Sequence, residues 1–332
     1  MKPYEQHITS ALRSRPVAAL MVALGILAVI RAWQVLPWPA NPLATPSVGA
    51  FSPEPLFRIY PASLAGAVTL AMAIVVMAAM AVINRTFIVL HTTSVLYTGI
   101  FAITAASAFI VTATDVAGMT LALTVLATIY IMYGSYQCPR HTRRLFMVFF
   151  LLSAGAIADW TFAAYIPVMF VGCAQMRCLT MRSATAAIIG IITPVWILLG
   201  FGVVDPDSFT VPRLQSAVRF FNRPEAWPML GWTALLVTTG IITNVSNLIR
   251  VYSQNARTRA FNGILSTVTL ATELLCVIDF GRIASLMPLL CCCVALQVAQ
   301  YFHFKEERRG YIAPCLLIMG CALIYVWQLW IL

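Results

Sequence analysis

The chain has 332 residues, of which 61% are hydrophobic and only 10% are charged, and its mean hydropathy is +0.88. Soluble domains carry about 25% charged residues, and a soluble fold of this composition would lack the polar surface needed to cover its apolar side chains. The net charge of +10 comes from short segments between apolar blocks, too short to present an aromatic and basic surface to nucleic acid. We therefore expect an integral membrane protein with no nucleic-acid partner.

The apolar residues form uninterrupted blocks of about the length that crosses a hydrocarbon core of about 30 Å, which takes about 20 helical residues. The blocks show no two-residue alternation of the kind found in membrane β-strands. We predict an all-α polytopic transmembrane helix bundle, a single integral membrane domain over residues 1–332 with eleven spans. The predicted spans are 17–35, 63–83, 87–111, 116–134, 143–157, 160–174, 184–204, 227–249, 260–278, 283–301 and 311–331.

The distribution of basic residues predicts how the spans are oriented, because cytoplasmic segments are enriched in Lys and Arg. With the amino terminus inside and the carboxyl terminus outside, 15 of the 21 basic residues fall in cytoplasmic segments. Reading 143–174 as one long helix would place Arg177 and Arg182 outside and reverse every later loop. We therefore predict a short helical hairpin near 143–174 that turns at Asp159 and Trp160. Its short arms imply tilt or burial among other helices.

Ionisable residues within spans are the first candidates for a function, because each costs roughly 2.5 to 3.5 kcal/mol to insert. Glu273 lies deep in the ninth span, and Arg31 lies at a comparable depth in the first. We predict that Glu273 faces the bundle, either as structural polar contact between helices or as a proton relay or ligand group, and that it has the geometric option of pairing with Arg31. Asp159 either caps the helix that follows it or presents a carboxylate to a substrate.

Two external loops are long enough to form structure. Residues 36–62 make a proline-rich loop, which favours stiff extended chain and contains Glu54. Residues 205–226 contain apolar residues at helical spacing after Pro212, so an interfacial amphipathic helix is predicted near 212–222. Its arginines could hold a phosphate or diphosphate, or simply contact ordinary lipid phosphates; they are Arg213, Arg219 and Arg223.

Neither a cofactor nor a metal site is predicted. The nine cysteines show no CxxC pair and no Cys/His spacing typical of metal ligands. Cys291, Cys292 and Cys293 are consecutive within the tenth predicted span, and we interpret them as small packing residues.

Several segments resemble a family of uncharacterised multi-spanning bacterial inner-membrane proteins, and the resemblance covers most of the chain. It implies a multi-pass protein of the bacterial inner (cytoplasmic) membrane. The segments are the stretch from Asn84-Arg85-Thr86 to Arg182 with its Met176-Arg177-Cys178-Leu179, then Gly190 to Trp196, and Asn255 to Arg259.

A second, more distant similarity is to multi-span glycosyltransferases and O-antigen polymerases that use polyprenyl-linked sugars. It lies in the short hairpin, the basic turn after it and the Pro194 to Trp196 helix. Those glycosyltransferases generally carry an acidic catalytic residue in the first external loop, and only Glu54 occupies that place here.

Three hypotheses follow for the function. The first is a non-enzymatic component that supports cell-envelope assembly together with membrane lipids and a membrane-protein partner, favoured by the few polar groups within the spans. The second is an enzyme acting on a polyprenyl-linked glycan at the outer face, with the three loop arginines on the diphosphate and Glu54 or Asp159 as base. The third is a transporter or flippase that uses Glu273.

Overall fold

The computed structural model describes residues 3–35, 49–51, 62–87, 95–107, 116–138, 142–203, 209, 214–304 and 310–331. All regular structure in these residues is helical, and no strand occurs among them. The α-helices are α1 (Pro3–Arg13), α2 (Arg15–Val35), α3 (Ala62–Phe87), α4 (Leu96–Ser107), α6 (Ala117–Tyr133), α7 (Thr142–Ala158), α8 (Tyr165–Gln175), α9 (Met181–Gly200), α10 (Trp227–Val251), α11 (Ala256–Ile278), α12 (Ile283–Phe304) and α13 (Ile312–Ile331). Short 3-10 helices are η1 (Trp160–Phe162), η3 (Ala217–Phe220), η4 (Pro224–Ala226) and η5 (Phe280–Arg282).

The protein is an all-helical membrane protein. Within the described part of the chain, seven helical segments are long and apolar enough to cross a bilayer. Their outward faces carry large apolar side chains, as on α9, where Ile189 and Trp196 are more than half exposed. A water-soluble protein rarely exposes so much contiguous apolar surface, whereas lipid tails cover it without cost.

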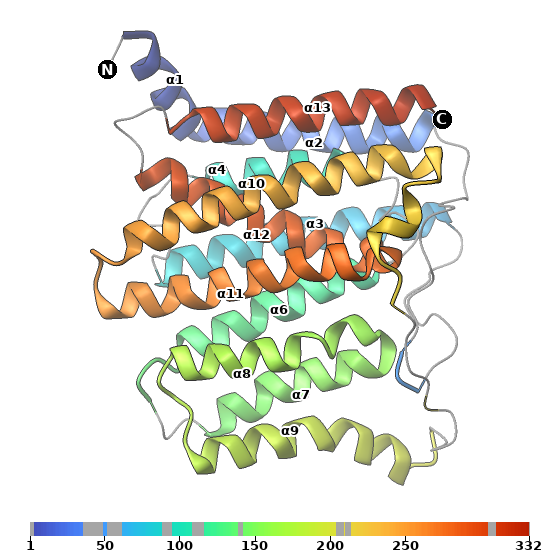
Figure 1. Cartoon of the computed structure of the whole chain (residues 1–332), viewed down its shortest axis with the longest axis vertical. Helices are drawn as coiled ribbons and strands as arrows, with labels where there is room; N and C mark the ends of the chain where they lie inside the picture. Colours follow the sequence, from blue (N-terminus) through green and yellow to red (C-terminus); the bar gives the residue numbers. More distant parts are fainter. Residues whose placement is uncertain are drawn as a thin grey trace.

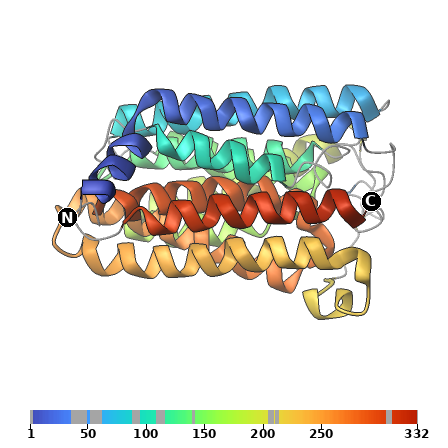
Figure 2. The ribbon, with the colours of Figure 1, turned by 90° about the horizontal axis from the view of Figure 1, so that it is seen from above.

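The helices lie side by side in an elongated bundle (Figure 1). Helices α2 and α13 form one edge, where the Tyr325 hydroxyl donates to the Ala28 carbonyl at 2.8 Å. Helix α9 forms the opposite edge and packs against α7. The chain begins with α1 at one end of the bundle and finishes α13 at the other, as both Figure 1 and the view from above in Figure 2 show.

Helix α12 is the centre of the bundle. Every residue from 283 to 300 is buried, because α4, α6, α10, α11 and α13 surround it. Gly118 of α6 allows part of this approach, since a Cβ atom there would lie 2.5 Å from the Ala284 carbonyl oxygen. A helix buried on all sides has no lipid-facing stripe, so each polar side chain it carries must find a partner inside the protein.

The helical hairpin predicted near 143–174 is present as α7 and α8, joined by η1. Helix α7 packs more extensively on α9 than on α8, and Gly190 of α9 faces the Phe146 carbonyl of α7. The Ser153 hydroxyl also donates to the Ile191 carbonyl of α9 at 2.6 Å. The three helices α7, α8 and α9 therefore form one side of the bundle.

The predicted boundaries of the second and third spans are wrong. Helix α3 continues to Phe87, and α4 begins only at Leu96, whereas a single span had been predicted for 87–111. Phe87 belongs to the end of α3 because its ring packs edge-on against Tyr130, Tyr133 and Phe261 at centroid distances of 5.3 to 5.8 Å. The polar run His91-Thr92-Thr93-Ser94, which precedes α4 closely, was the signal for this boundary that the span prediction did not use.

Cys291, Cys292 and Cys293 are buried in α12, in agreement with the packing interpretation. Among the described residues, no group of three or more His, Cys, Asp and Glu side chains lies close enough to hold a metal ion.

Candidate functional site

Polar side chains line the buried faces where α10, α11 and α12 meet. The members on α11 recur every three or four residues, which places them on one face of that helix. All of them are buried, and we call this set the polar seam. It consists of Asn244 and Asn247 of α10, Asn262, Ser266, Thr269, Thr272 and Glu273 of α11, and Gln297 and Gln300 of α12.

Hydrogen bonds within the polar seam connect all three helices. The Asn247 amide of α10 donates to the Gln297 side-chain oxygen of α12 at 2.8 Å and to its backbone carbonyl at 2.9 Å. The Gln300 amide of α12 donates to the Asn262 oxygen of α11 at 2.6 Å. The Ser266 hydroxyl donates to the Asn244 oxygen, which joins α11 to α10. These bonds fix the register of the three helices, because a shift of one turn would leave several buried amides unpaired.

Glu273 is the exception in the polar seam. It is 3% exposed, and neither carboxyl oxygen has a hydrogen-bond partner among the residues that the structure describes. The carboxyl group lies against Gly240 of α10, where an added Cβ atom would be 2.0 Å from the nearer oxygen. A side chain at position 240 would therefore require the carboxyl group to move. Two amide atoms of the same seam, the Asn247 oxygen and the Asn262 nitrogen, are also buried with no partner in the part of the chain that the structure describes. The seam thus has hydrogen-bonding capacity that the protein itself leaves unused.

A second cluster of polar side chains lies at the carboxyl end of α11. Asp159 is fully buried at the start of η1, where one carboxylate oxygen accepts from the Thr161 N–H at 2.9 Å and the Thr161 hydroxyl at 2.7 Å. The other oxygen accepts from the Ser285 hydroxyl of α12 at 2.8 Å. The helix-capping interpretation of Asp159 is confirmed, and both of its oxygens are engaged within the protein.

Arg282 connects Asp159 to a second buried carboxylate. Its guanidinium nitrogens lie 3.8 Å from Asp159 and 3.5 Å from Asp279. Asp279 also accepts from the Gln215 N–H at 3.2 Å, and the Gly281 N–H donates to the Gln215 carbonyl at 3.2 Å. Burial raises the pKa of Asp279, and the Gln215 N–H and Arg282 only partly oppose this. The cluster ties the 214–216 segment and the α7–η1 turn to the α11–α12 turn.

Sequence reasoning missed Asp279 and Arg282 as partners of Asp159. Both stand in the short turn Asp279-Phe280-Gly281-Arg282 between two predicted spans, on the same side of the membrane as the predicted hairpin turn. Their shared side of the membrane was the one indication in the sequence that the two turns could meet. Nothing else in the sequence indicates that these two turns are neighbours in the bundle.

The structure does not bring Glu273 and Arg31 together. Arg31 lies on an exposed face of α2, beside Tyr325 of α13. Helix α2 packs chiefly on α4, whereas α11 packs on α8, α10 and α12. The two residues were predicted at a similar depth in the membrane, but other helices lie between α2 and α11.

The amphipathic α-helix predicted near 212–222 is not formed in the described residues of this segment. Residues 214–216 are non-helical and two 3-10 turns follow, η3 and η4, because the bonds from Gln215 to Asp279 and Gly281 hold the chain open. Arg219 and Arg223 are exposed, and the Arg223 guanidinium lies 5.7 Å from the Phe220 ring centroid. Arg213 and Glu54 lie outside the described residues.

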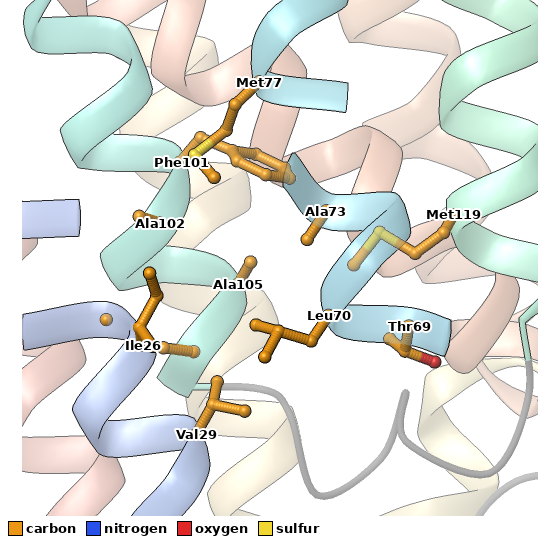
Figure 3. Close-up of a pocket in the computed structure, with 12 residues that line it drawn as sticks. Ile26, Val29, Thr69, Leu70, Ala73, Met77, Phe101, Ala102, Ala105 and Met119 are labelled. Atoms are coloured by element: carbon orange, nitrogen blue, oxygen red, sulfur yellow. The ribbon is translucent and has the colours of Figure 1, made fainter. Parts of the chain in front are cut away.

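A hollow of about 30 Å³ lies between α2, α3 and α4 (Figure 3). This is about the volume of one water molecule, and its polar lining is limited to Thr69. It is therefore a packing defect without the groups needed for recognition. The labelled side chains that surround it are Ile26, Val29, Thr69, Leu70, Ala73, Met77, Phe101, Ala102, Ala105 and Met119.

Comparison with protein-family models, curated proteins and solved structures finds no match to this chain.

The Arg282 cluster predicts a large stability effect. Replacing Arg282 by Met leaves two buried carboxylates without their counter-charge, so the free energy of unfolding should fall by about 3 kcal/mol. Thermal unfolding of the detergent-purified variant measures this loss. Arg219→Met, which removes an exposed arginine from the same side of the bundle, is the control and should change little. Equal unfolding midpoints for the two variants would show that the cluster does not stabilise the bundle.

Proposed function

We propose that the protein is a non-enzymatic, proton-translocating membrane transporter, and that Glu273 carries the proton through the polar seam. The observation behind this proposal is the pair of buried carboxyl oxygens that have no hydrogen-bond partner in the described part of the chain. An ionised carboxylate without a counter-charge is costly in an apolar interior, and intramembrane carboxyl groups are typical of proton relays. A structural contact between helices would instead use both oxygens, as Asp159 does.

The length of the polar seam supports this proposal. From residue 262 to residue 273, α11 rises about 16 Å at 1.5 Å per residue. This is about half of a hydrocarbon core of about 30 Å. A chain of hydroxyl and amide groups over that distance offers successive hydrogen-bonding positions to a proton carrier or a small polar solute, which lipid-facing side chains do not.

Helix α12 offers a means of movement beside the carboxyl group. It contains Pro288, which cannot donate a backbone hydrogen bond and so weakens the helix near the Ala284 carbonyl. The helix itself is continuous from Ile283 to Phe304, so Pro288 is a point of weakness and not a break. Bending at Pro288 would shift Gln297 and Gln300 relative to α11, and the hydrogen bonds of the polar seam would then form between different partners.

We further propose eleven spans with the amino terminus in the cytoplasm and the carboxyl terminus outside, in a bacterial inner membrane. In support, a helix lies in each of the eleven predicted ranges, and α1 and the end of α13 lie at opposite ends of the bundle (Figures 1 and 2). The helix ends and turns at the α1 end carry most of the described arginines. These are Arg13, Arg15, Arg85, Arg143, Arg144, Arg177, Arg182, Arg250, Arg257 and Arg259.

The other two hypotheses have less support than transport. The scaffold hypothesis depended on a scarcity of polar groups within the spans, and the polar seam removes that basis. The glycan-enzyme hypothesis loses Asp159 as a candidate base, because both of its oxygens are engaged, and Glu54 lies outside the described residues. If the transported solute were a precursor of the cell envelope, the proposed transporter would also support envelope assembly.

Proton flux tests the proposed role of Glu273. Proteoliposomes that contain a pH-sensitive dye and carry an inside-negative potassium diffusion potential should take up protons faster than protein-free vesicles. Glu273→Gln should lower this flux at least tenfold, because the amide keeps the shape but cannot release a proton. Glu225→Gln, the same change at an exposed glutamate, should retain it. Undiminished flux through Glu273→Gln would contradict the proposal, as would equal rates in wild-type and protein-free vesicles.

Topology is tested separately. An epitope tag inserted after Leu179, an exposed residue between α8 and α9, should bind antibody only after the cells are permeabilised. Alkaline phosphatase fused after Leu332 should be active, because that enzyme folds outside the cytoplasm. Antibody binding at the Leu179 tag in intact spheroplasts would overturn the proposed orientation.

A further inference from the structure

A polar cavity of about 410 Å³ opens at the end of the bundle where α8 finishes and α11 begins. This is the end that also carries α1 (Figure 1). The cavity is separate from the polar seam, and it is more than ten times larger than the apolar hollow near α2. Its lining consists of Tyr136, Gln175, Arg177, Ala256, Arg259, Ala260 and Gly263.

The charge of the cavity is positive. Arg177 and Arg259 line it, and no acidic residue does. Neither guanidinium has a hydrogen-bond or ion-pair partner within the described part of the chain. The nearby Arg257 differs from them, because its guanidinium lies 5.2 Å from the Phe261 ring centroid and it does not line the cavity. Two unpaired arginines facing one space of this size are suited to a multivalent oxyanion, which guanidinium groups bind with paired hydrogen bonds.

The backbone holds Arg177 in an unfavourable conformation. Helix α8 ends with the Arg177 N–H on the Ala174 carbonyl at 3.0 Å and the Cys178 N–H on the Cys173 carbonyl at 3.2 Å. Such an ending needs a left-handed residue, usually glycine, yet Arg177 occupies it with φ of 53°. The side chain is therefore placed at the cavity at a cost in backbone free energy, a pattern that clusters at functional sites.

A second strained residue lies beside the first. Gln137 has φ of 54°, and its N–H donates to the Met176 carbonyl at 3.2 Å. In the described part of the chain, Gln137 and Arg177 are the two non-glycine residues with positive φ. Arg177 lines the cavity itself, and Tyr136, the residue before Gln137, lines it as well. The strain is thus concentrated at one position in the bundle.

Gln175 supplies a different group on the inner wall. Its amide nitrogen donates to the Thr267 hydroxyl of α11 at 2.8 Å, which fixes the orientation of the side chain. Its oxygen is buried, has no hydrogen-bond partner among the described residues, and lies against Gly263. A ligand that fills the cavity would therefore present negative oxygens to the arginines and a hydroxyl hydrogen to Gln175. A phosphate group that keeps one hydroxyl, free or in a small organic phosphate, has both features.

We propose that this cavity binds a phosphate-bearing anion through Arg177 and Arg259, with Gln175 accepting a hydrogen bond from the ligand. The proposal does not depend on proton transfer at Glu273. The phosphate could belong to a soluble ion or to a lipid headgroup at the membrane surface, and the chemistry of recognition is the same for both.

Titration calorimetry on the full chain in an uncharged detergent tests the site, with inorganic phosphate and glycerol phosphate as the probes. Arg259→Gln should weaken binding at least tenfold. Arg177→Gly should weaken it as much without lowering the unfolding midpoint, because glycine suits the left-handed position. A loss of stability in that variant would contradict the strain argument. Arg257→Gln, at the second residue of α11 and outside the cavity, should bind as the wild type does.

Binding measurements in two lipid compositions distinguish a soluble phosphate from a lipid headgroup. If a soluble anion is the ligand, phosphate should bind equally well in nanodiscs of phosphatidylcholine and of phosphatidylglycerol. If a headgroup is the ligand, phosphatidylglycerol should compete with phosphate, and Arg177→Gly should remove the competition. Wild-type affinity in both arginine variants, or no binding of either probe by the wild type, would overturn the proposal.

Discussion

The complete burial of α12 is the constraint on which the rest of the structure depends. A helix with no lipid-facing side must satisfy its polar groups against its neighbours, so Gln297 and Gln300 determine where Asn247 and Asn262 lie. Each such pair would be costly to break in a medium without water. The polar seam therefore both holds α10, α11 and α12 in register and creates the environment in which Glu273 is placed.

The two ends of α11 differ in a way that matters for transport. At one end Arg282 neutralises two buried carboxylates and joins three turns, which closes the bundle. At the other end the arginine-lined cavity is open, and Gln175 connects its wall to Thr267 of α11. Under the proposed transport function, the bundle would be open at the end with the arginine-lined cavity and closed at the end with the Arg282 cluster, as expected for one state of an alternating-access cycle.

Much of the helix order could be predicted from sequence, because apolar blocks of span length and arginine-rich turns are local signals. The burial of Glu273 and the capping role of Asp159 were accessible for the same reason. The polar seam was not, because its amides and hydroxyls are uncharged and hydropathy averages them away; their spacing of three or four residues was the unused signal. Contacts between turns that are distant in the sequence could not be predicted either. The hydrogen bonds of Gln215 with Asp279 and Gly281, which prevent the predicted helix near 212–222, are of this kind.

The central claim is that Glu273 gains and loses a proton inside the bundle, and infrared spectroscopy of the reconstituted protein over a pH series measures this directly. If Glu273 exchanges its proton there, a protonated-carboxyl band should titrate in the wild type, disappear in Glu273→Gln and persist in Glu225→Gln. A titrating band that is unchanged in Glu273→Gln would contradict it.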